Sequence, residues 1–262
     1  MARSRARSFL AEGLGQSRLG RSLAGRLPHP VQRAVADHVF GRPYVRWGNM
    51  RRMEPFSNEW GFDRGQPVDR VYIEGFLERH ARDLRGAVLE VQDSRLTDRF
   101  GDEAVTAREV LDIDVANTLA TIVGDLSDPA TLPQERFDCF ILTETLQLVP
   151  DLDGALRNAY SALRPGGVLL ITVPVLSRID PLSVAFDSWR ITANGMERLI
   201  DRCCQGSDRE VRSEGNLIVS VAFLQGLCSN DLRERELSVV DPSFPVVTTA
   251  RVVKPPGRQP HG

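Results

Sequence analysis

Cysteine and histidine are scarce in this sequence, with four of each among 262 residues. The cysteines are Cys139, Cys203, Cys204 and Cys228. They form no C-x-x-C pair and none lies near a histidine, so the spacing typical of a metal site is absent. Cys139 falls inside an apolar run, where an unpaired cysteine packs as a small hydrophobic side chain. We therefore expect no bound metal and a reducing, intracellular environment.

Long hydrophobic runs are also absent. No apolar stretch approaches the ~20 residues of a membrane-spanning helix, and no signal-peptide core precedes a cleavage-like site. The composition is 42% hydrophobic and 26% charged with a net charge of −2, which is typical of a soluble globular protein. These features predict a cytoplasmic protein that does not bind nucleic acid, with one large α/β domain.

Positive charge is concentrated near the N-terminus. Residues 1–52 contain eleven arginines but only Glu12 and Asp37 as acids. The arginines alternate with leucines, a pattern that suits either a basic amphipathic helix on an anionic membrane surface or partner, or a solvated arm. We predict a basic arm over 1–45, one domain over 46–254 and a disordered end over 255–262.

The rest of the chain alternates between strand-like and helix-like segments. The predicted strands are 87–91, 109–114, 120–126, 137–143, 168–173 and 244–253. The predicted helices are 68–84, 152–163 and 192–203, with Thr192 as an N-cap, while 216–227 suits either a helix or a strand. This alternation predicts a doubly wound, mostly parallel sheet, with too few residues between the second and third strands for a helix.

Polar residues lie at the carboxyl ends of successive predicted strands or directly after them. They are Glu90, Gln92, Asp93, Asp112, Asp114, Asp125, Thr143, Glu144 and Gln147. The carboxyl ends of parallel strands form the ligand site of such sheets, although a strand-end acid can also cap the helix that follows it. Acids bind ribose hydroxyls and repel phosphates, and no G-x-G-x-x-G follows the first strand. A cationic, phosphate-free nucleoside such as S-adenosylmethionine is favoured over NAD.

Several motifs resemble those of the class I S-adenosylmethionine-dependent methyltransferases. They are V-L-E-V-Q-D, V-L-D-I-D, V-G-D-L, F-D-C-F-I-L-T-E-T-L-Q-L-V and L-R-P-G-G-V-L-L-I-T-V-P, within residues 68–253. The segments 60–70 and 187–192 resemble a bacterial branch associated with sugar and polysaccharide biosynthesis. The resemblance implies a Rossmann-like sheet of seven strands, abbreviated between strands 1 and 3.

The resemblance also implies roles for individual residues. Glu90, Gln92 and Asp93 correspond to the wall beside the methionine part of the cofactor, and Asp114 corresponds to the ribose contact. Asp125 and Leu126 correspond to the adenine side, and Thr143 and Glu144 to the floor beneath the sulfonium. Two positions depart from the family pattern. Gln92 replaces a glycine, and Glu144, Gln147 and Leu148 replace the metal-binding E-x-x-E-H of some relatives.

The function that these features favour is O-methylation of a sugar, polysaccharide or glycolipid-like acceptor. Glu144 and Asp187 are the candidate bases, and Trp189 and Arg190 are the candidate contacts to the acceptor. The alternative is a methyltransferase-fold protein without activity that serves as a binding partner or scaffold in a surface-glycan pathway. An NAD-dependent oxidoreductase ranks below both. The basic arm is the candidate for peripheral membrane contact, and no oligomeric state is predicted.

Overall fold

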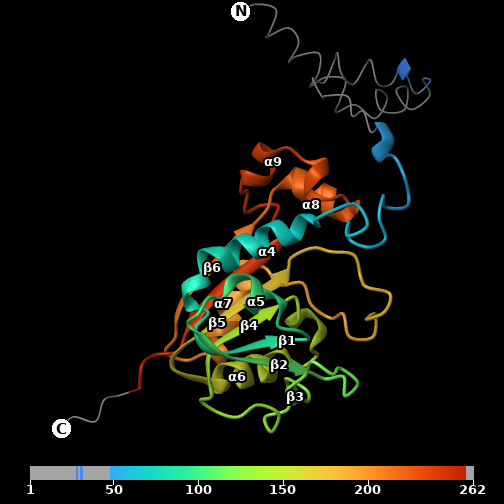
Figure 1. Ribbon diagram of the computed structural model, residues 1–262. Coiled ribbons are helices and arrows are strands. Elements are labelled where there is room, and N and C mark those ends of the chain that lie inside the picture. The colour runs from blue at the N-terminus through green and yellow to red at the C-terminus, as the bar shows by residue number, and fades with distance from the viewer. Residues whose placement is uncertain (1–27, 29, 32–47, 258–262) are drawn as a thin grey trace, which may run out of the picture. The chain divides into compact units, whose positions relative to one another are not determined.

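In the computed structural model, which describes residues 28, 30–31 and 48–257, seven strands form one sheet (Figure 1). The strands are β1 (Gly86–Val91), β2 (Val105–Asp112), β3 (Ile122–Val123), β4 (Phe137–Thr143), β5 (Leu163–Pro174), β6 (Asp208–Glu214) and β7 (Val247–Val253). Their spatial order is β3-β2-β1-β4-β5-β7-β6. Strand β7 is antiparallel to both neighbours, and the other pairs are parallel. The predicted Rossmann-like sheet is confirmed.

The strand order reverses between β1 and β4. From β1 the chain builds outward through β2 and β3, and it then returns to place β4 on the other side of β1. Glu90 is in register with Ile141, so the carboxyl-terminal parts of the two strands lie side by side. In doubly wound sheets the ligand crevice opens beyond the carboxyl ends of the strands at such a reversal.

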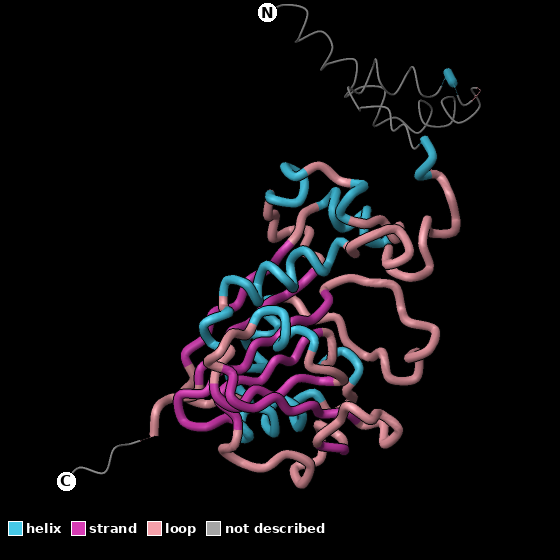
Figure 2. Tube along the Cα trace, in the orientation of Figure 1, coloured by secondary structure: helices cyan, strands magenta, loops and turns pink. Residues whose placement is uncertain are grey.

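Both faces of the sheet are covered by helices (Figures 1 and 2). Side chains from α4 (Val68–Arg79), α5 (Arg95–Phe100) and α8 (Leu217–Leu224) pack on one face, and side chains from α6 (Leu152–Ala162) and α7 (Ala193–Cys203) pack on the other. Successive strand residues point to opposite faces. Because helices cover both faces of the sheet, side chains on both sides of β4 are buried. This explains the nearly continuous apolar run of its sequence.

Three helices begin at polar residues that cap them. The side chain of Asp151 accepts a hydrogen bond from Gly154 N, and that of Thr192 accepts one from Gly195 N. Thr192 is thus the N-cap that the sequence predicts. Asn216 caps α8 in the same way, so the apolar segment that suited a helix or a strand is helical.

Short helices complete the described chain. They are η1 (Gly48–Met50), η2 (Ala81–Asp83), η3 (Leu146–Leu148), η4 (Ser229–Asp231) and α9 (Glu234–Ser238). The helix expected to reach residue 84 ends at Arg79 and is followed by η2. The connection between β2 and β3 contains turns and no helix among residues 113–121, as the abbreviated spacing predicts.

Strand β6 is absent from the sequence-based prediction. Its sequence, D-R-E-V-R-S-E, is charged at most positions, and its residues are mainly half-buried or exposed. An edge strand can carry such charges because one of its sides faces water. The prediction therefore failed where the apolar signal of a buried strand is weakest.

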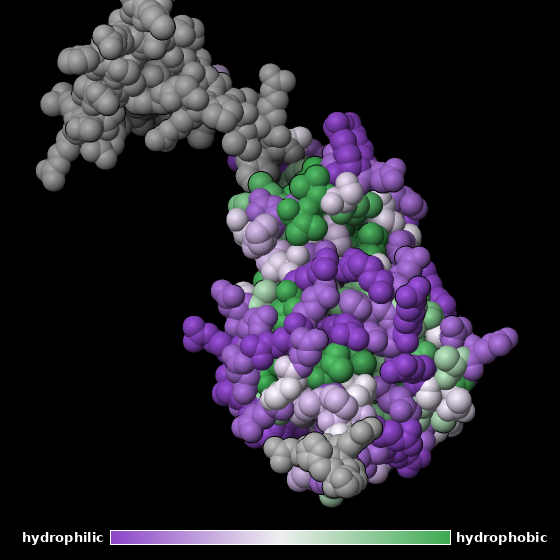
Figure 3. Space-filling model, turned by 90° about the vertical axis from the view of Figure 1, so that its left-hand side faces the viewer, coloured by the Kyte–Doolittle hydropathy of each residue, from purple (hydrophilic) through white to green (hydrophobic). Residues whose placement is uncertain are grey.

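The face in Figure 3 is mostly hydrophilic, with apolar side chains in small groups.

The chain divides into two units, residues 1–53 and residues 54–262. The sheet lies wholly in the second unit. The predicted basic arm and the end of the chain fall almost entirely outside the described residues, so both stay predictions. No helix in the described ranges combines the length and apolar character needed to cross a membrane.

Candidate functional site

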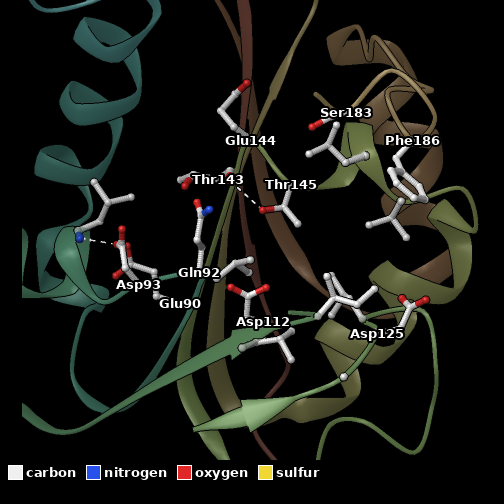
Figure 4. Close-up of a pocket in the computed structure, with 18 of the residues that line it drawn as sticks. Glu90, Gln92, Asp93, Asp112, Asp125, Thr143, Glu144, Thr145, Ser183 and Phe186 are labelled. Carbon is white, nitrogen blue, oxygen red and sulfur yellow. Dashed lines mark hydrogen bonds between the residues drawn. The ribbon is translucent and has the colours of Figure 1, made fainter. Parts of the chain in front are cut away.

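A cavity of about 500 Å³ opens at the carboxyl ends of β1, β2 and β4, where the strand order reverses. This volume lies within the ~300–1,000 Å³ that is usual for small-molecule sites. In Figure 4, Glu90, Gln92 and Asp93 lie on one side of the cavity, and Ser183 and Phe186 lie on the opposite side. The fold therefore brings most of the predicted site residues together around one space.

Glu90 is engaged by the helix that follows it. It is 3% exposed, and its carboxylate accepts hydrogen bonds from Leu96 N (3.0 Å), Thr97 N (2.8 Å) and Thr97 Oγ1 (2.8 Å). Burial raises the pKa of this carboxyl group, although the hydrogen bonds oppose the shift. Glu90 lines the cavity, but its oxygens hold the start of α5 in place. It thus plays the capping part expected of some strand-end acids.

Gln92 adopts the backbone conformation that usually requires glycine. Its φ is +74°, and its N–H donates to Leu111 O (2.9 Å) while its carbonyl accepts from Asn117 Nδ2 (2.7 Å). The left-handed turn is therefore kept although the glycine is absent. The exposed Gln92 side chain stands at the cavity, beside Asp93, whose carboxylate accepts from Arg95 N (2.9 Å).

The acid at the end of β2 that reaches the cavity is Asp112. Asp114, the residue expected to contact a ribose, is exposed and is not among the residues that line the cavity. The difference arises because β2 ends at Asp112, two residues earlier than predicted. The Asp112 carboxylate accepts from Asp114 N (2.9 Å) and Asn117 Nδ2 (2.6 Å), which fixes the turn beyond the strand.

Asp125, Leu126 and Thr143 lie where the sequence places them, in the cavity lining. Leu126 is buried, and its carbonyl accepts from Asn158 Nδ2 on α6 (2.9 Å), which anchors this wall. Asp125 is exposed and accepts from Ser127 N (2.8 Å). One wall therefore combines an apolar surface with carboxylates at its rim.

Glu144 lies where the first cavity meets a second one. It directly follows β4 with φ +48°, a strained conformation for a residue with a side chain. Its N–H donates to Thr172 O (2.9 Å), and its carboxylate accepts from Thr172 Oγ1 (3.2 Å). Burial, with the nearby charge of Asp69, raises its pKa to about 7. A carboxyl group that changes protonation near neutral pH is suited to act as a base.

The second cavity, of about 260 Å³, shares four lining residues with the first. The shared residues are Arg70, Glu144, Leu148 and Ser183. Trp60 and Phe62 also line the second cavity, with side chains from α4 and from the segment after β5. Two molecules bound in the two cavities would therefore meet beside Glu144.

Asp187 and Arg190 line the second cavity as an ion pair. The two side chains form two hydrogen bonds, one of them Arg190 Nη2 to Asp187 Oδ2 (3.0 Å). Hydrogen bonding to Arg190 lowers the pKa of the Asp187 carboxyl group. Such a carboxylate is a weak base, so the structure favours Glu144 over Asp187 for that role. Trp189 does not line either cavity, and its indole N–H donates to Val149 O (3.0 Å).

Asp69 and Arg70 are among the lining residues that the sequence-based prediction of the site missed. Asp69 and Arg70 lie in the first turn of α4 and line the second cavity. A signal for Asp69 was present, because it shares the apolar stripe of Ile73 and Phe76, where an acid is unexpected.

Among residues 48–257, no three His, Cys, Asp or Glu side chains are grouped to hold a metal ion.

A model of the methyltransferase domain family matches residues 56–205, which is more than half of the chain. The chain is also similar to the ubiquinone/menaquinone biosynthesis C-methyltransferase UbiE of Escherichia coli and of Shigella boydii, with 42% identity over 57 residues. That match covers 22% of this chain and 23% of each relative, so it spans about a quarter of the relatives' length.

Solved structures with a similar fold include two S-adenosylmethionine-dependent methyltransferases. The protein from Mesorhizobium loti is 15% identical, with 74% of this chain and 100% of that chain covered and a TM-score of 0.49. The protein from Archaeoglobus fulgidus is 14% identical, with 71% and 94% covered and a TM-score of 0.46.

Proposed function

Because the chain belongs to the methyltransferase domain family, we propose that it is an S-adenosylmethionine-dependent methyltransferase that acts on a hydroxyl group. The observation that carries this proposal is the position of Glu144. This carboxylate borders both cavities, and its pKa of about 7 lets it accept a proton under neutral conditions. One cavity is assigned to the cofactor and the other to the acceptor.

The first cavity fits a cationic nucleoside in its chemistry. Asp93, Asp112 and Asp125 line it with carboxylates, which attract a positive charge and can accept hydrogen bonds from ribose hydroxyls. Leu111 and Leu126 supply apolar surface for a base. Asp112 takes the ribose role first expected of Asp114. The bound cofactor would supply a methyl group that is already activated for displacement.

The second cavity is assigned to a sugar, polysaccharide or glycolipid-like acceptor. Glu144 accepts the proton that the acceptor hydroxyl releases, and Thr172 orients the Glu144 carboxylate through its hydroxyl. Arg190, held by Asp187, contributes a fixed wall of this cavity. The remaining contribution of the protein is to hold the two reactants in line, which can lower a barrier by several kcal/mol, roughly 7–11 in the best cases.

The proposal is tested by binding and by labelling. Calorimetry should show that S-adenosylmethionine and S-adenosylhomocysteine bind to the full chain and to Glu144→Gln. The unaltered protein, but not Glu144→Gln, should then transfer label from methyl-labelled cofactor to the glycan and glycolipid fraction of a cell extract, as an O-methyl sugar. Glu78→Gln, an exposed change on α4, is the matched control. A C-methyl product, or transfer at an undiminished rate by Glu144→Gln, contradicts the proposal.

A scaffold without activity is the second candidate, because Gln92 occupies the position of a family glycine. This alternative requires that the first cavity bind no cofactor. It is supported if neither S-adenosylmethionine nor S-adenosylhomocysteine binds at millimolar concentration, and it fails if either binds.

We also propose a peripheral membrane contact for the basic N-terminal arm. Its support is the excess of arginine over acids in residues 1–52, with leucines between the arginines. Arginines attract anionic headgroups, and the leucines can enter the interface. A glycolipid-like acceptor would be found at the same surface.

A further inference from the structure

Buried polar atoms without hydrogen-bond partners are concentrated in the second cavity. Three of them belong to its lining residues: Asp69 Oδ1, Arg70 Nε and Gln147 Oε1. Asp69 and Gln147 are each 8% exposed. An unpaired buried polar group destabilises the folded state, and native proteins contain few of them. Three in one cavity indicate a place where a ligand supplies the missing partners.

The types of these three atoms restrict the ligand. Gln147 Oε1 can only accept a hydrogen bond, and Arg70 Nε can only donate one. The Asp69 carboxylate accepts when it is ionised, and burial raises the pKa of this group toward the protonated form, which can also donate. An ammonium group donates but does not accept, and a carboxylate or phosphate accepts but does not donate. A hydroxyl group does both. A ligand with neighbouring hydroxyls therefore satisfies all three atoms, and neither kind of ion does so.

Other charged side chains of the second cavity also favour a neutral ligand. Arg190 is paired with Asp187, and Arg178 lies over the Trp60 ring (4.2 Å) and donates to Asn58 O. These cations are thus engaged by the protein itself. Asp69 and Glu144 would repel an anionic ligand from the same cavity, and a neutral polyol avoids that cost.

The unpaired atoms lie next to the base. Gln147 Nε2 donates to the carbonyl of Glu144 (2.7 Å), so the side chain of Gln147 is held against the residue that borders both cavities. Asp69 is close enough for its charge to act on the Glu144 carboxyl group. One hydroxyl of a ligand can therefore face Glu144 while its neighbour faces Asp69 and Gln147.

We propose that the second cavity recognises a vicinal diol: Asp69 and Gln147 accept hydrogen bonds from the hydroxyl adjacent to the one that Glu144 deprotonates. This inference rests on the proposed function and adds the requirement for a second hydroxyl. Asp69 and Gln147 determine specificity, because an acceptor with a single hydroxyl leaves their buried oxygens unpaired.

The test uses three six-membered rings as probes: myo-inositol, cyclohexanol and cyclohexylamine. Their binding to the full chain is measured by saturation-transfer NMR, with and without S-adenosylhomocysteine. We expect myo-inositol to bind at least about 10-fold more tightly than the other two rings. A ring that cannot make one of the hydrogen bonds to a buried charged group loses about that factor in affinity. Asp69→Leu should weaken myo-inositol by a similar factor, whereas Glu78→Gln should leave it unchanged.

Thermal unfolding separates this role from a structural one. Asp69→Leu removes a buried carboxylate that has an unpaired oxygen, so its Tm should rise by about 2–4 °C. Asp69→Asn, which keeps the shape of the side chain, should fold as well and bind myo-inositol more weakly. A lower Tm for both variants indicates a structural role and overturns the proposal. It is equally overturned if no ring binds, or if cyclohexylamine binds more tightly than myo-inositol.

The same binding measurements test the proposed function separately from the diol site. If S-adenosylhomocysteine does not bind but myo-inositol binds in an Asp69-dependent manner, the methyl-transfer assignment fails and the polyol site stands. If S-adenosylhomocysteine binds and myo-inositol does not, the methyl-transfer assignment stands and the diol requirement fails.

Discussion

Gln92 shows that a left-handed turn can be built without glycine. Its φ of +74° places it where a side chain normally costs about 1–2 kcal/mol. Glycine would remove that strain but would lose more freedom on folding, by about 0.5–1 kcal/mol. The two effects nearly cancel, which explains how the substitution is tolerated. The glycine of the family pattern is therefore not required for the shape of this turn.

We predict that Gln92→Gly changes the free energy of unfolding by less than about 1 kcal/mol, whereas Gln92→Val lowers it by about 1–3 kcal/mol. A β-branched side chain is poorly tolerated at positive φ, which is the reason for the difference. Urea unfolding measures both changes, and Gln92→Ala controls for the loss of the long side chain. Equal stability of the glycine and valine variants would show that the turn is not constrained.

Glu144 makes the stability of the protein depend on pH. Its pKa is raised to about 7 in the folded state, so the folded protein holds this proton at pH values where the unfolded chain has lost it. The contribution of Glu144 is then most favourable below the pKa of an ordinary glutamate, and it is lost as the pH rises through about 7. A raised carboxyl pKa thus destabilises the native state at neutral and alkaline pH.

We predict that Glu144→Gln is more stable than the unaltered protein at about pH 8, by roughly 1–3 kcal/mol, and that this advantage disappears toward pH 5. Urea unfolding at a series of pH values measures it. Asp125→Asn, which changes an exposed carboxylate of the first cavity, is the control. An advantage that is constant over this pH range would mean that Glu144 does not titrate there.

At the scale of elements, one side chain of the segment 175–191, between β5 and α7, bonds to several residues of the same segment. Arg190 bonds to the Asp187 carboxylate (3.0 Å), to Trp189 O (2.8 Å) and to Arg178 O (3.2 Å). The same segment contributes Ser183 and Phe186 to the first cavity. The guanidinium thus ties the two ends of a long connection that forms one wall of the site.

We predict that Arg190→Lys lowers the free energy of unfolding by about 1–3 kcal/mol, because an ammonium group cannot replace the planar fork. Urea unfolding measures the loss. Since Arg190 lowers the pKa of Asp187, the pair stabilises the protein above the ordinary aspartate pKa and loses this effect as the pH falls through the lowered value. The loss should therefore shrink in strong acid.

Arg202→Lys provides the comparison. Arg202 pairs with Asp153 at the surface, where its side chain is 55% exposed, so its replacement should cost less than about 1 kcal/mol. If both lysine variants lose the same stability, the Arg190 contacts do not hold the segment.

The elements that sequence alone predicts well are those with a strong apolar signal. Strand β4 and helix α6 match their predicted ranges closely, and α7 begins after its predicted cap, Thr192. Strand β6 has almost no apolar side chains, and its place comes from pairing with β7, which local sequence does not encode. Strand β3 is reduced to two residues because the tight turns on either side of it take up the rest of its apolar run.

The site residues also differ in how well sequence alone predicts them. Residues at the ends of strands, such as Gln92 and Glu144, were found because strand ends converge at one edge of the sheet. Asp69 was not found, because it comes from α4 and reaches the second cavity only through packing. The predicted strand ended at residue 114, whereas β2 ends at Asp112, so Asp112 and not Asp114 lines the first cavity.

For the whole molecule, we predict that removing residues 1–45 lowers binding to vesicles that contain anionic lipid and leaves the binding of S-adenosylhomocysteine unchanged. The reason is that the arginine excess lies in the first unit, whereas both cavities lie within residues 54–262. Co-sedimentation with anionic and neutral vesicles measures the first effect, and calorimetry the second. Equal sedimentation of the full and shortened chains with anionic vesicles would discard the arm as a membrane contact.

The two outer strands of the sheet have a consequence for the behaviour of the protein at high concentration. Strand β3, at one edge, is only two residues long, and β6, at the other, carries acidic and basic side chains at most positions. Unpaired strand edges are templates on which other chains add, and brevity and charge both oppose such addition. The fold thus limits fibre formation by edge-to-edge growth. The charged residues that made β6 difficult to predict from sequence also oppose the addition of another chain at this edge.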